Sequence, residues 1–215
     1  GQCDLYLSTR HNGQWSGPRN MGPRVNTHRN ETQPAFSPDG RSLYFASNRS
    51  GGPGQMDIWR IDWRSNGSWS AAQVLDSTVN SVHNEKTPFI HYDNQTLYYT
   101  SDRPEGYGAS DLYLSRKKQG EWQAAKNLRW PINTAAAEGT IYVALDGRTG
   151  YMGRRERPGM DYDIYTFELD TSVASQRTTY VKGQVIDAET RAGVSAQVMV
   201  YDGGGNRQIA NIQTD

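Results

Sequence analysis

The feature that most constrains the fold of this chain is an internal repeat of about fifty residues. Tripeptides of the form Asp-(Leu/Ile)-(Tyr/Trp) begin at Asp4, Asp57, Asp111 and Asp163, at offsets of 53, 54 and 52 residues. Further positions keep the same phase: Trp15, Trp69 and Trp122; Asn26, Asn80 and Asn133; Glu31, Glu85 and Glu138; Asp39, Asp93 and Asp146. Several independent markers in one phase predict a supersecondary unit repeated along the chain.

Each repeat unit predicts four short strands and no helix. In the second unit, 57–63 alternates apolar and polar residues, which is the pattern of a half-buried strand. The Ser37-Pro38-Asp39-Gly40 turn precedes another strand, and a Gly- and Pro-rich loop follows it. Four strands repeated about every fifty residues predict the blades of an all-β propeller. The expected strands of this unit are 34–37, 42–47, 57–63 and 69–75.

Composition supports this prediction and excludes some partners. Only 35% of the 215 residues are hydrophobic, yet 11% are aromatic and 22 are glycine, which suits short, tightly turned strands. The formal net charge is zero, so the chain lacks the basic surface expected for nucleic-acid or anionic-membrane binding. No apolar run reaches the roughly 18 residues of a membrane span. The single cysteine, Cys3, has no partner for an intrachain disulfide.

The phase of the repeat also predicts how many blades the chain contains. Gly1-Gln2-Cys3-Asp4 aligns with Gly54-Gln55-Met56-Asp57, so residue 1 falls inside a blade, and about three and a half blades are expected over 1–170. Closed propellers have about four to eight blades. We therefore expect further blades upstream in the intact protein, or completion of the propeller by another chain.

A second domain is expected to begin near residue 179. The polar segment 171–178 breaks the blade period and is predicted to be a linker. Beyond it, 180–187 and 196–201 alternate as strands on either side of a turn at 188–193, which is a β-sandwich pattern. Only about 37 residues remain, so we expect 179–215 to be a truncated sandwich module.

The repeat unit resembles the WD-like repeats of the TolB-type propeller family. The resemblance rests on the Ser37-Pro38-Asp39-Gly40 turn, the strand Leu43-Tyr-Phe-Ala-Ser-Asn-Arg49, and Asp57-Ile58-Trp59. The third unit keeps the pattern with Tyr98-Tyr-Thr-Ser-Asp-Arg103, whereas the fourth departs from it at Gly150-Tyr-Met-Gly-Arg-Arg155. The Gly-rich loop before the aspartate is most similar to cell-envelope versions from Bacteroidetes. The resemblance covers roughly 1–170 and speaks to fold more than to function.

The C-terminal segment resembles the start of a carboxypeptidase-regulatory-like domain. Gly183, Asp187, Thr190, Gly193 and Thr214-Asp215 carry this resemblance. A propeller followed by such a module is similar to peptidoglycan-associated, OmpA-family components of the type IX secretion system. This order implies a periplasmic, outer-membrane-associated protein with envelope protein partners. Any contact with peptidoglycan would be made by a domain outside this chain.

Two sets of recurring charges are the candidate binding residues. Arg49, Arg103 and Arg155 lie across a hairpin loop from Asp57, Asp111 and Asp163, so they predict either hairpin-closing ion pairs or a ring of charge at one mouth of the propeller. Glu31, Glu85 and Glu138 precede the strands that line a propeller channel, and the crossovers that carry them should share a face with the arginine loops. Tyr107 belongs to the same candidate partner-binding surface. For the glutamates, capping of backbone amides competes with Ca²⁺ binding.

The other repeated residues have structural interpretations. Asp4, Asp57, Asp111 and Asp163, like Trp15, Trp69 and Trp122, are predicted to maintain the repeat, with the tryptophans packed between blades and sugar stacking as the alternative. Asp39, Asp93 and Asp146 need no role beyond their turns, although the turns superficially resemble the Asp-box of sialidases. His11, His28, His83 and His91 lack metal-ligand spacing and are expected at surface or turn positions. No metal or cofactor is expected.

Two classes of function remain open from the sequence. Features present in every blade, without a singular catalytic cluster, favour a non-catalytic, protein-binding scaffold of the cell envelope. The alternative is a propeller-type hydrolase, either sialidase-like or the gating propeller of a serine peptidase, or a carbohydrate-binding module. The sequence contains no Gly-x-Ser-x-Gly nucleophile elbow, which disfavours the peptidase within this chain.

Overall fold

The structure is a computed structural model that describes residues 3–11, 13–179, 183–201 and 208–214. The chain divides into two compact units, Gly1–Thr178 and Thr179–Asp215. Every regular element in the described residues is a β-strand. The described part of the chain holds no helix with the length and apolar character needed to cross a membrane.

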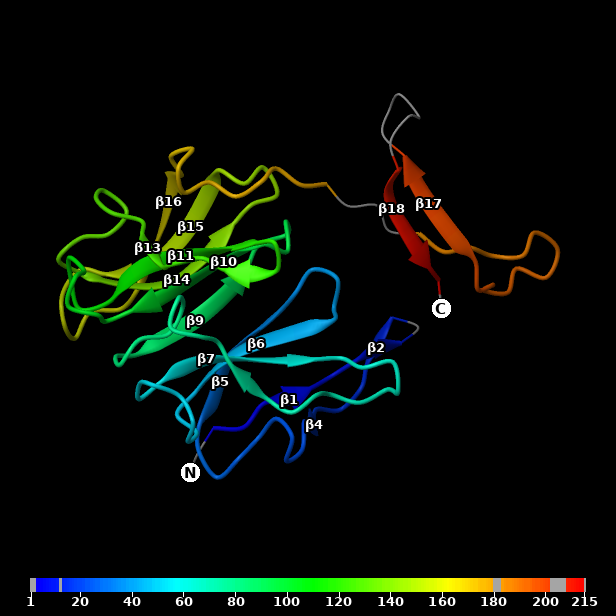
Figure 1. Cartoon of the computed structure of the whole chain (residues 1–215), viewed down its shortest axis with the longest axis horizontal. Helices are drawn as coiled ribbons and strands as arrows, with labels where there is room; N and C mark the ends of the chain where they lie inside the picture. Colours follow the sequence, from blue (N-terminus) through cyan, green and yellow to red (C-terminus); the bar gives the residue numbers. More distant parts are fainter. Residues whose placement is uncertain (1–2, 12, 180–182, 202–207, 215) are drawn as a thin grey trace. The chain divides into compact units, whose positions relative to one another are not determined.

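Unit 1 is a series of antiparallel sheets (Figure 1). The last three repeat units form one sheet each, and the first, partial unit forms two two-stranded sheets. The all-β partial propeller predicted from the repeat is therefore confirmed. The first blade contains β5 (Glu31–Phe36), β6 (Ser42–Ser47), β7 (Asp57–Asp62) and β8 (Gln73–Val74); the second contains β9 (Glu85–Ile90), β10 (Thr96–Ser101), β11 (Asp111–Lys118), β12 (Glu121–Trp122) and β13 (Lys126–Asn127); the third contains β14 (Ala137–Val143), β15 (Thr149–Arg155) and β16 (Asp163–Glu168). Before them, β1 (Tyr6–Leu7) pairs with β4 (Arg19–Asn20), and β2 (Arg10–His11) pairs with β3 (Gln14–Trp15).

The hydrophobic core lies between the blades. Strands β6 and β10 are buried along their whole length, because each middle strand is covered on both faces. Leu43 and Phe45 pack toward Leu5 in one cluster, while Tyr44, between them in the sequence, packs with Tyr99 of the second blade in another. Burying side chains of this size contributes about 1.5–3 kcal/mol each, so the stacking of blades holds unit 1 together.

The repeated asparagines connect each third strand to the crossover that follows it. Asn80 Oδ1 accepts a hydrogen bond from the backbone N–H of Ile58 at 2.8 Å, and Asn80 Nδ2 donates to the Ile58 carbonyl oxygen at 3.0 Å. The side chain thereby satisfies a backbone donor and acceptor as a neighbouring strand would. The sequence analysis identified these asparagines as positions that keep the phase of the repeat and predicted no hydrogen-bonding role for them. The three pairs are Asn26 with Leu5, Asn80 with Ile58, and Asn133 with Leu112.

The segment 171–178, predicted to be a linker, packs against unit 1 instead. Val173 is buried, its carbonyl oxygen accepts a hydrogen bond from the Tyr98 hydroxyl at 2.8 Å, and Ser175 N–H donates to the Gly147 carbonyl. Val173 occupies the crossover position that Val79 and Ile132 hold in the two preceding crossovers. The third blade runs from β16 directly into this crossover, which is why its sheet has three strands rather than four.

In the described residues of unit 2, β17 (Gln197–Tyr201) pairs antiparallel with β18 (Gln208–Gln213). The predicted strand at 196–201 is confirmed by β17. Of the other predicted strand, 180–182 lies outside the described residues. The remainder, 183–187, forms an isolated bridge between Ile186 and Gly193.

Candidate functional site

The recurring arginines pair with the recurring glutamates, not with the aspartates that the sequence suggested. Arg49 Nη2 lies 3.1 Å from Glu31 Oε1, and Arg103 Nη2 lies 3.0 Å from Glu85 Oε1. The predicted Arg–Asp pairs are wrong because Ser47 is the residue opposite both Glu31 and Asp57 in the sheet. Arg49, two residues after Ser47, therefore pairs with Glu31 on one neighbouring strand rather than with Asp57 on the other.

The third blade repeats this ion pair with Arg154, not with the predicted Arg155. Arg154 Nε lies 3.1 Å from Glu138 Oε1, and Arg154 is also the strand partner of Asp163. Arg155 instead places its guanidinium 5.3 Å from the ring centroid of Tyr162. The correction amounts to one residue, which in a strand moves a side chain to the opposite face.

These ion pairs are buried in the blades. The glutamate side chains are fully buried, and the Arg49 and Arg103 side chains are only 10% and 15% exposed. Each arginine also donates to a crossover carbonyl: Arg49 to Val25, Arg103 to Val79, and Arg154 to Ile132. The paired side chains therefore lie within the blades and stabilise the sheets, and a role of the predicted residues in binding a partner stays a prediction.

The capping interpretation of the glutamates is confirmed in the first two blades. Glu31 Oε2 accepts the backbone N–H of Thr27 at 2.8 Å, and Glu85 Oε2 accepts that of Ser81 at 2.8 Å. Glu138 accepts the Thr134 hydroxyl instead. Among the described residues, no group of three or more histidine, cysteine, aspartate or glutamate side chains could hold a metal ion.

The aspartates that open each third strand close the Gly-rich loop before them. Asp57 accepts the Gly54 N–H at 3.1 Å. Asp111 accepts the N–H groups of Tyr107 and Gly108, at 2.7 and 3.0 Å, and in addition Asn127 Nδ2 at 2.8 Å. Burial raises the pKa of Asp57 to about 6, and the nearby Glu85 charge adds to this rise, whereas the hydrogen bond from the Gly54 N–H opposes it.

The turn aspartates act as the sequence predicted, and one of the histidines also lies at a turn. Asp146 accepts side-chain and backbone hydrogen bonds from Thr149, at 2.6 and 2.9 Å, which lower its pKa to about 2. His91, expected at a surface or turn position, lies at the turn that contains Asp93 and is fully buried there. Its Nδ1 accepts the Asp93 N–H, and its Nε2 lies 3.0 Å from the Ala144 carbonyl oxygen in the third blade.

The repeated tryptophans occupy three different environments. Trp122 is buried and meets Tyr44 of the first blade edge-on, 6.3 Å between ring centroids, as interblade packing predicts. Trp69 packs partly buried against Trp63 and Phe36. Trp15 is 68% exposed, so the prediction fails there, because the short β2–β3 hairpin is exposed along both strands.

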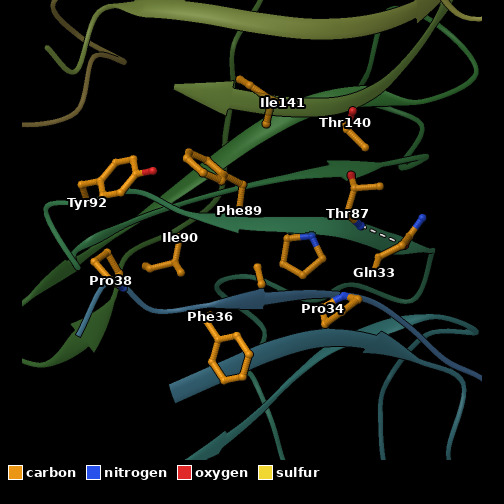
Figure 2. A pocket seen from close by; sticks show the side chains of 12 residues that line it. Gln33, Pro34, Phe36, Pro38, Thr87, Phe89, Ile90, Tyr92, Thr140 and Ile141 are labelled. Carbon is orange, nitrogen blue, oxygen red and sulfur yellow. Dashed lines mark hydrogen bonds between the residues drawn. The ribbon is translucent and has the colours of Figure 1, made fainter. Parts of the chain in front are cut away.

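A hollow between the innermost strands is the site that sequence reasoning missed. It has a volume of about 430 Å³ and lies among β5, β9 and β14 of the three blades (Figure 2). Figure 2 shows Phe36 on one side, Phe89 and Tyr92 on another, and Ile141 from the third blade. We call this the axial pocket. Its twelve lining residues carry no formal charge: Gln33, Pro34, Ala35, Phe36, Pro38, Thr87, Pro88, Phe89, Ile90, Tyr92, Thr140 and Ile141.

Two residues in an unusual backbone conformation flank the axial pocket. Gln33 and Thr87 have φ angles of 53° and 50°, and each precedes a proline inside a first strand. The pairing of β5 with β6 shifts register between Thr32 and Ala35, so the first of these positions is a β-bulge. Non-glycine residues at positive φ cost about 1–3 kcal/mol and cluster at functional sites. The in-phase dipeptides Gln33-Pro34 and Thr87-Pro88 are the signal that could have found this site.

Hydrogen bonds from these same two residues link the three blades. Gln33 Oε1 accepts the Thr87 N–H at 3.0 Å, and the Thr87 hydroxyl donates to the Gly139 carbonyl oxygen at 3.4 Å. A second hollow of about 730 Å³ continues along β14 and β15, and the residues that it shares with the axial pocket are Gln33, Thr87, Phe89, Thr140 and Ile141. The arrangement offers aromatic and aliphatic surface with a few polar anchors, which suits binding of an uncharged segment rather than acid–base chemistry.

Comparison with known proteins identifies the fold. Neither a family model nor a curated protein matches the chain. TolB from Acinetobacter baumannii is 19% identical, with a TM-score of 0.52 over 95% of this chain and 44% of that one. A TolB from Agrobacterium tumefaciens is 16% identical, with a TM-score of 0.52 over 79% of this chain and 58% of that one. This chain thus spans about half the length of the TolB structures it matches.

A puromycin-hydrolysing peptidase from Mycobacterium tuberculosis is also similar, at 14% identity and a TM-score of 0.49 over 92% of this chain and 34% of that one. At this level the similarity does not bear on activity. Together, the sheets of unit 1 and the two TolB structures show that this chain has the fold of TolB-type β-propellers.

Proposed function

We propose that unit 1 is a non-catalytic scaffold that binds an uncharged segment of a protein partner in the axial pocket. The observation that carries the proposal is the pairing of an uncharged, aromatic lining with two strained bulges on a rigid set of stacked blades. Of the side chains that line the pocket, Tyr92 is the one with a titratable group. Nothing in the lining therefore supplies the base or carboxylate pair that a hydrolase needs.

The cellular setting is part of the same proposal. We place the protein in the periplasm, associated with the outer membrane, as a PorE-like component of the type IX secretion system. The TolB-type fold of unit 1 supports an envelope role, and the carboxypeptidase-regulatory-like sequence of unit 2 supports the finer assignment. Association with peptidoglycan would belong to a domain outside this chain.

Removal of aromatic surface from the axial pocket tests the function. Phe36 and Tyr92 are both partly exposed, so the double variant F36A/Y92A is expected to fold. In a cross-linking pull-down from envelope extracts, we expect this variant to recover at least tenfold less of the main partner protein than the wild type does. Trp15→Ala removes a larger exposed aromatic ring elsewhere and is the matched control. Equal partner recovery by F36A/Y92A and wild type, at equal melting temperature, would exclude the pocket.

A further inference from the structure

The crossovers that link successive third strands to the next blade close with the same backbone turn. The hydrogen bonds run from Asn26 N–H to Gly22, Asn80 N–H to Asp76, Asn133 N–H to Arg129, and Ala174 N–H to Asp170, each 2.8–2.9 Å long. These bonds show that Gly22, Asp76, Arg129 and Asp170 hold equivalent positions. Of these four residues, only Arg129 carries a positive charge.

The side chains that cap these turns divide the crossovers into two kinds. In the first kind, the aspartate itself accepts a backbone N–H two residues on, as Asp76 does from Thr78 at 2.9 Å. In the second kind, an asparagine two residues earlier accepts the N–H of the turn residue. Asn20 accepts from Gly22 at 2.8 Å, and Asn127 accepts from Arg129 at 2.7 Å.

The second kind of turn requires a positive φ angle, which glycine adopts without strain. Gly22 has φ of 78°, and Arg129 has φ of 61° at the equivalent position. A residue with a Cβ atom is strained there, so folding alone favours glycine. Arginine at this position is therefore not explained by the turn. Strain held at one crossover and absent from its equivalents is the kind of outlier from which a functional role is inferred.

Arg129 lines a hollow of about 750 Å³ on the second blade, to which β11 contributes Tyr113 and β13 contributes Lys126 and Asn127. Lys126 contributes a second exposed cation, whose Nζ donates a hydrogen bond to the Ser172 carbonyl oxygen at 3.2 Å. None of the ion pairs among the described residues involves Lys126 or Arg129. Glu105 is the acidic residue of the lining. The buried carboxylates nearby are already occupied, since Glu85 pairs with Arg103 and Asp111 accepts three N–H donors.

The same hollow contains an unused hydrogen-bonding group and exposed apolar surface. Tyr113 lines it, and its buried hydroxyl, which lies near the Asn127 side chain, makes no hydrogen bond of normal geometry with the described residues. A buried hydroxyl without a partner is uncommon in a folded protein and calls for an explanation, of which a ligand is one. Tyr107, also in the lining, is 46% exposed, and the nearby Val82 is exposed as well. Tyr107 and Arg103 are thus two predicted partner-binding residues that line this hollow.

We propose that this hollow binds an acidic segment of a protein partner. A carboxylate of the segment pairs with Lys126 and Arg129, the Tyr113 hydroxyl donates a hydrogen bond to it, and an apolar neighbour in the segment packs against Tyr107. Charge complementarity selects this occupant, because the two accessible cations lack carboxylate partners of their own. The proposal is independent of the axial pocket, with which this hollow shares no residue.

The test measures binding of a labelled ten-residue peptide of alternating glutamate and phenylalanine, with blocked ends, to the full chain by fluorescence anisotropy. Arg129→Gly is the central variant, since glycine suits the φ angle and the fold should keep or gain stability. We expect R129G and K126Q each to weaken binding at least tenfold, and E105Q to tighten it about threefold. Lys118→Gln removes an exposed cation elsewhere on β11 and should leave binding unchanged.

Two further arms decide what is recognised. A peptide with glutamine in place of glutamate should bind at least tenfold more weakly, and inorganic phosphate at millimolar concentration should not displace the acidic peptide. Equal binding of the two peptides, or equal binding by wild type and R129G, would overturn the proposal. Displacement by phosphate would also overturn it, because the site would then bind small anions. F36A/Y92A should bind the acidic peptide as wild type does, which separates this site from the axial pocket.

Discussion

The first and second blades have the same interior but different surfaces. Arg49–Glu31 in the first and Arg103–Glu85 in the second are buried at the same place with nearly the same geometry. The crossovers that follow differ, with Val74 and Asp76 in one and Asn127 and Arg129 in the other. The shared residues hold the sheet together, and the differing ones change pKa values and accessible charge. Substituting a residue that serves the fold should therefore have the same effect in both blades. Substituting a residue with a specific role should have an effect in only one of them.

The largest effect is expected from breaking a buried ion pair in either blade. Arg103→Met leaves Glu85 buried without its cation, so the free energy of unfolding should fall by about 3–5 kcal/mol. Arg49→Met should cost the same, because Glu31 is equally buried. Urea denaturation at pH 7 measures both.

The controls for these variants distinguish burial from charge. Arg148→Met breaks an exposed pair with Glu168 and should cost less than about 1 kcal/mol. The double variant R103M/E85Q should recover part of the loss, since it removes the unpaired charge. If R103M and R148M cost the same, the ion pairs do not hold the blades as described.

A smaller loss is expected from the apolar packing between blades. Ile58 and Leu112 are equivalent, and both are fully buried, so I58A and L112A should each lower the free energy of unfolding by about 2–4 kcal/mol. Ile164 is the third-blade equivalent and is 83% exposed. I164A should therefore change stability by less than about 0.5 kcal/mol. A loss in I164A as large as that in I58A would show that this face is covered in solution.

The blades could be predicted from the sequence because their cause is periodic. A third strand such as Asp57–Asp62 must alternate, and its turn must contain residues that tolerate tight backbone angles, so both recur visibly. The partner of Arg49 could not be predicted in the same way. It depends on register, which places Ser47 opposite both Glu31 and Asp57 and lets its hydroxyl donate to Glu31 Oε1 at 2.9 Å. Register is a long-range property that local patterns leave open.

The candidate sites escaped sequence reasoning for the opposite reason, because they run against local preference. A residue before proline favours extended backbone, yet Gln33 and Thr87 take positive φ angles. Arg129 likewise occupies a turn that suits glycine. The prediction for segment 171–178 missed its packing because the polar composition concealed Val173 and Ser175, which are both buried. In each case, tertiary contacts prevail over the local signal.

The smallest predicted effect uses the difference at Val74. In the second blade, Asn127 donates to Asp111, whereas Val74 at the equivalent strand position gives Asp57 no such donor. Burial raises the pKa of Asp57 from 3.8 to about 6. The folded chain then binds a proton more tightly than the unfolded chain, so stability should fall as pH rises from about 4 to about 6 and stay level above it. The fall should be about 2–3 kcal/mol.

Val74→Asn supplies the missing donor and should reduce that fall to below about 1 kcal/mol, measured by urea denaturation at a series of pH values. Asp57→Asn removes the titrating group and should flatten the same part of the profile, which serves as the control. All other carboxylates are common to the wild type and both variants. The difference between their pH profiles therefore reports on the environment of the Asp57 carboxylate alone. If the V74N profile is as steep as that of the wild type, an amide donor is not what distinguishes the two blades.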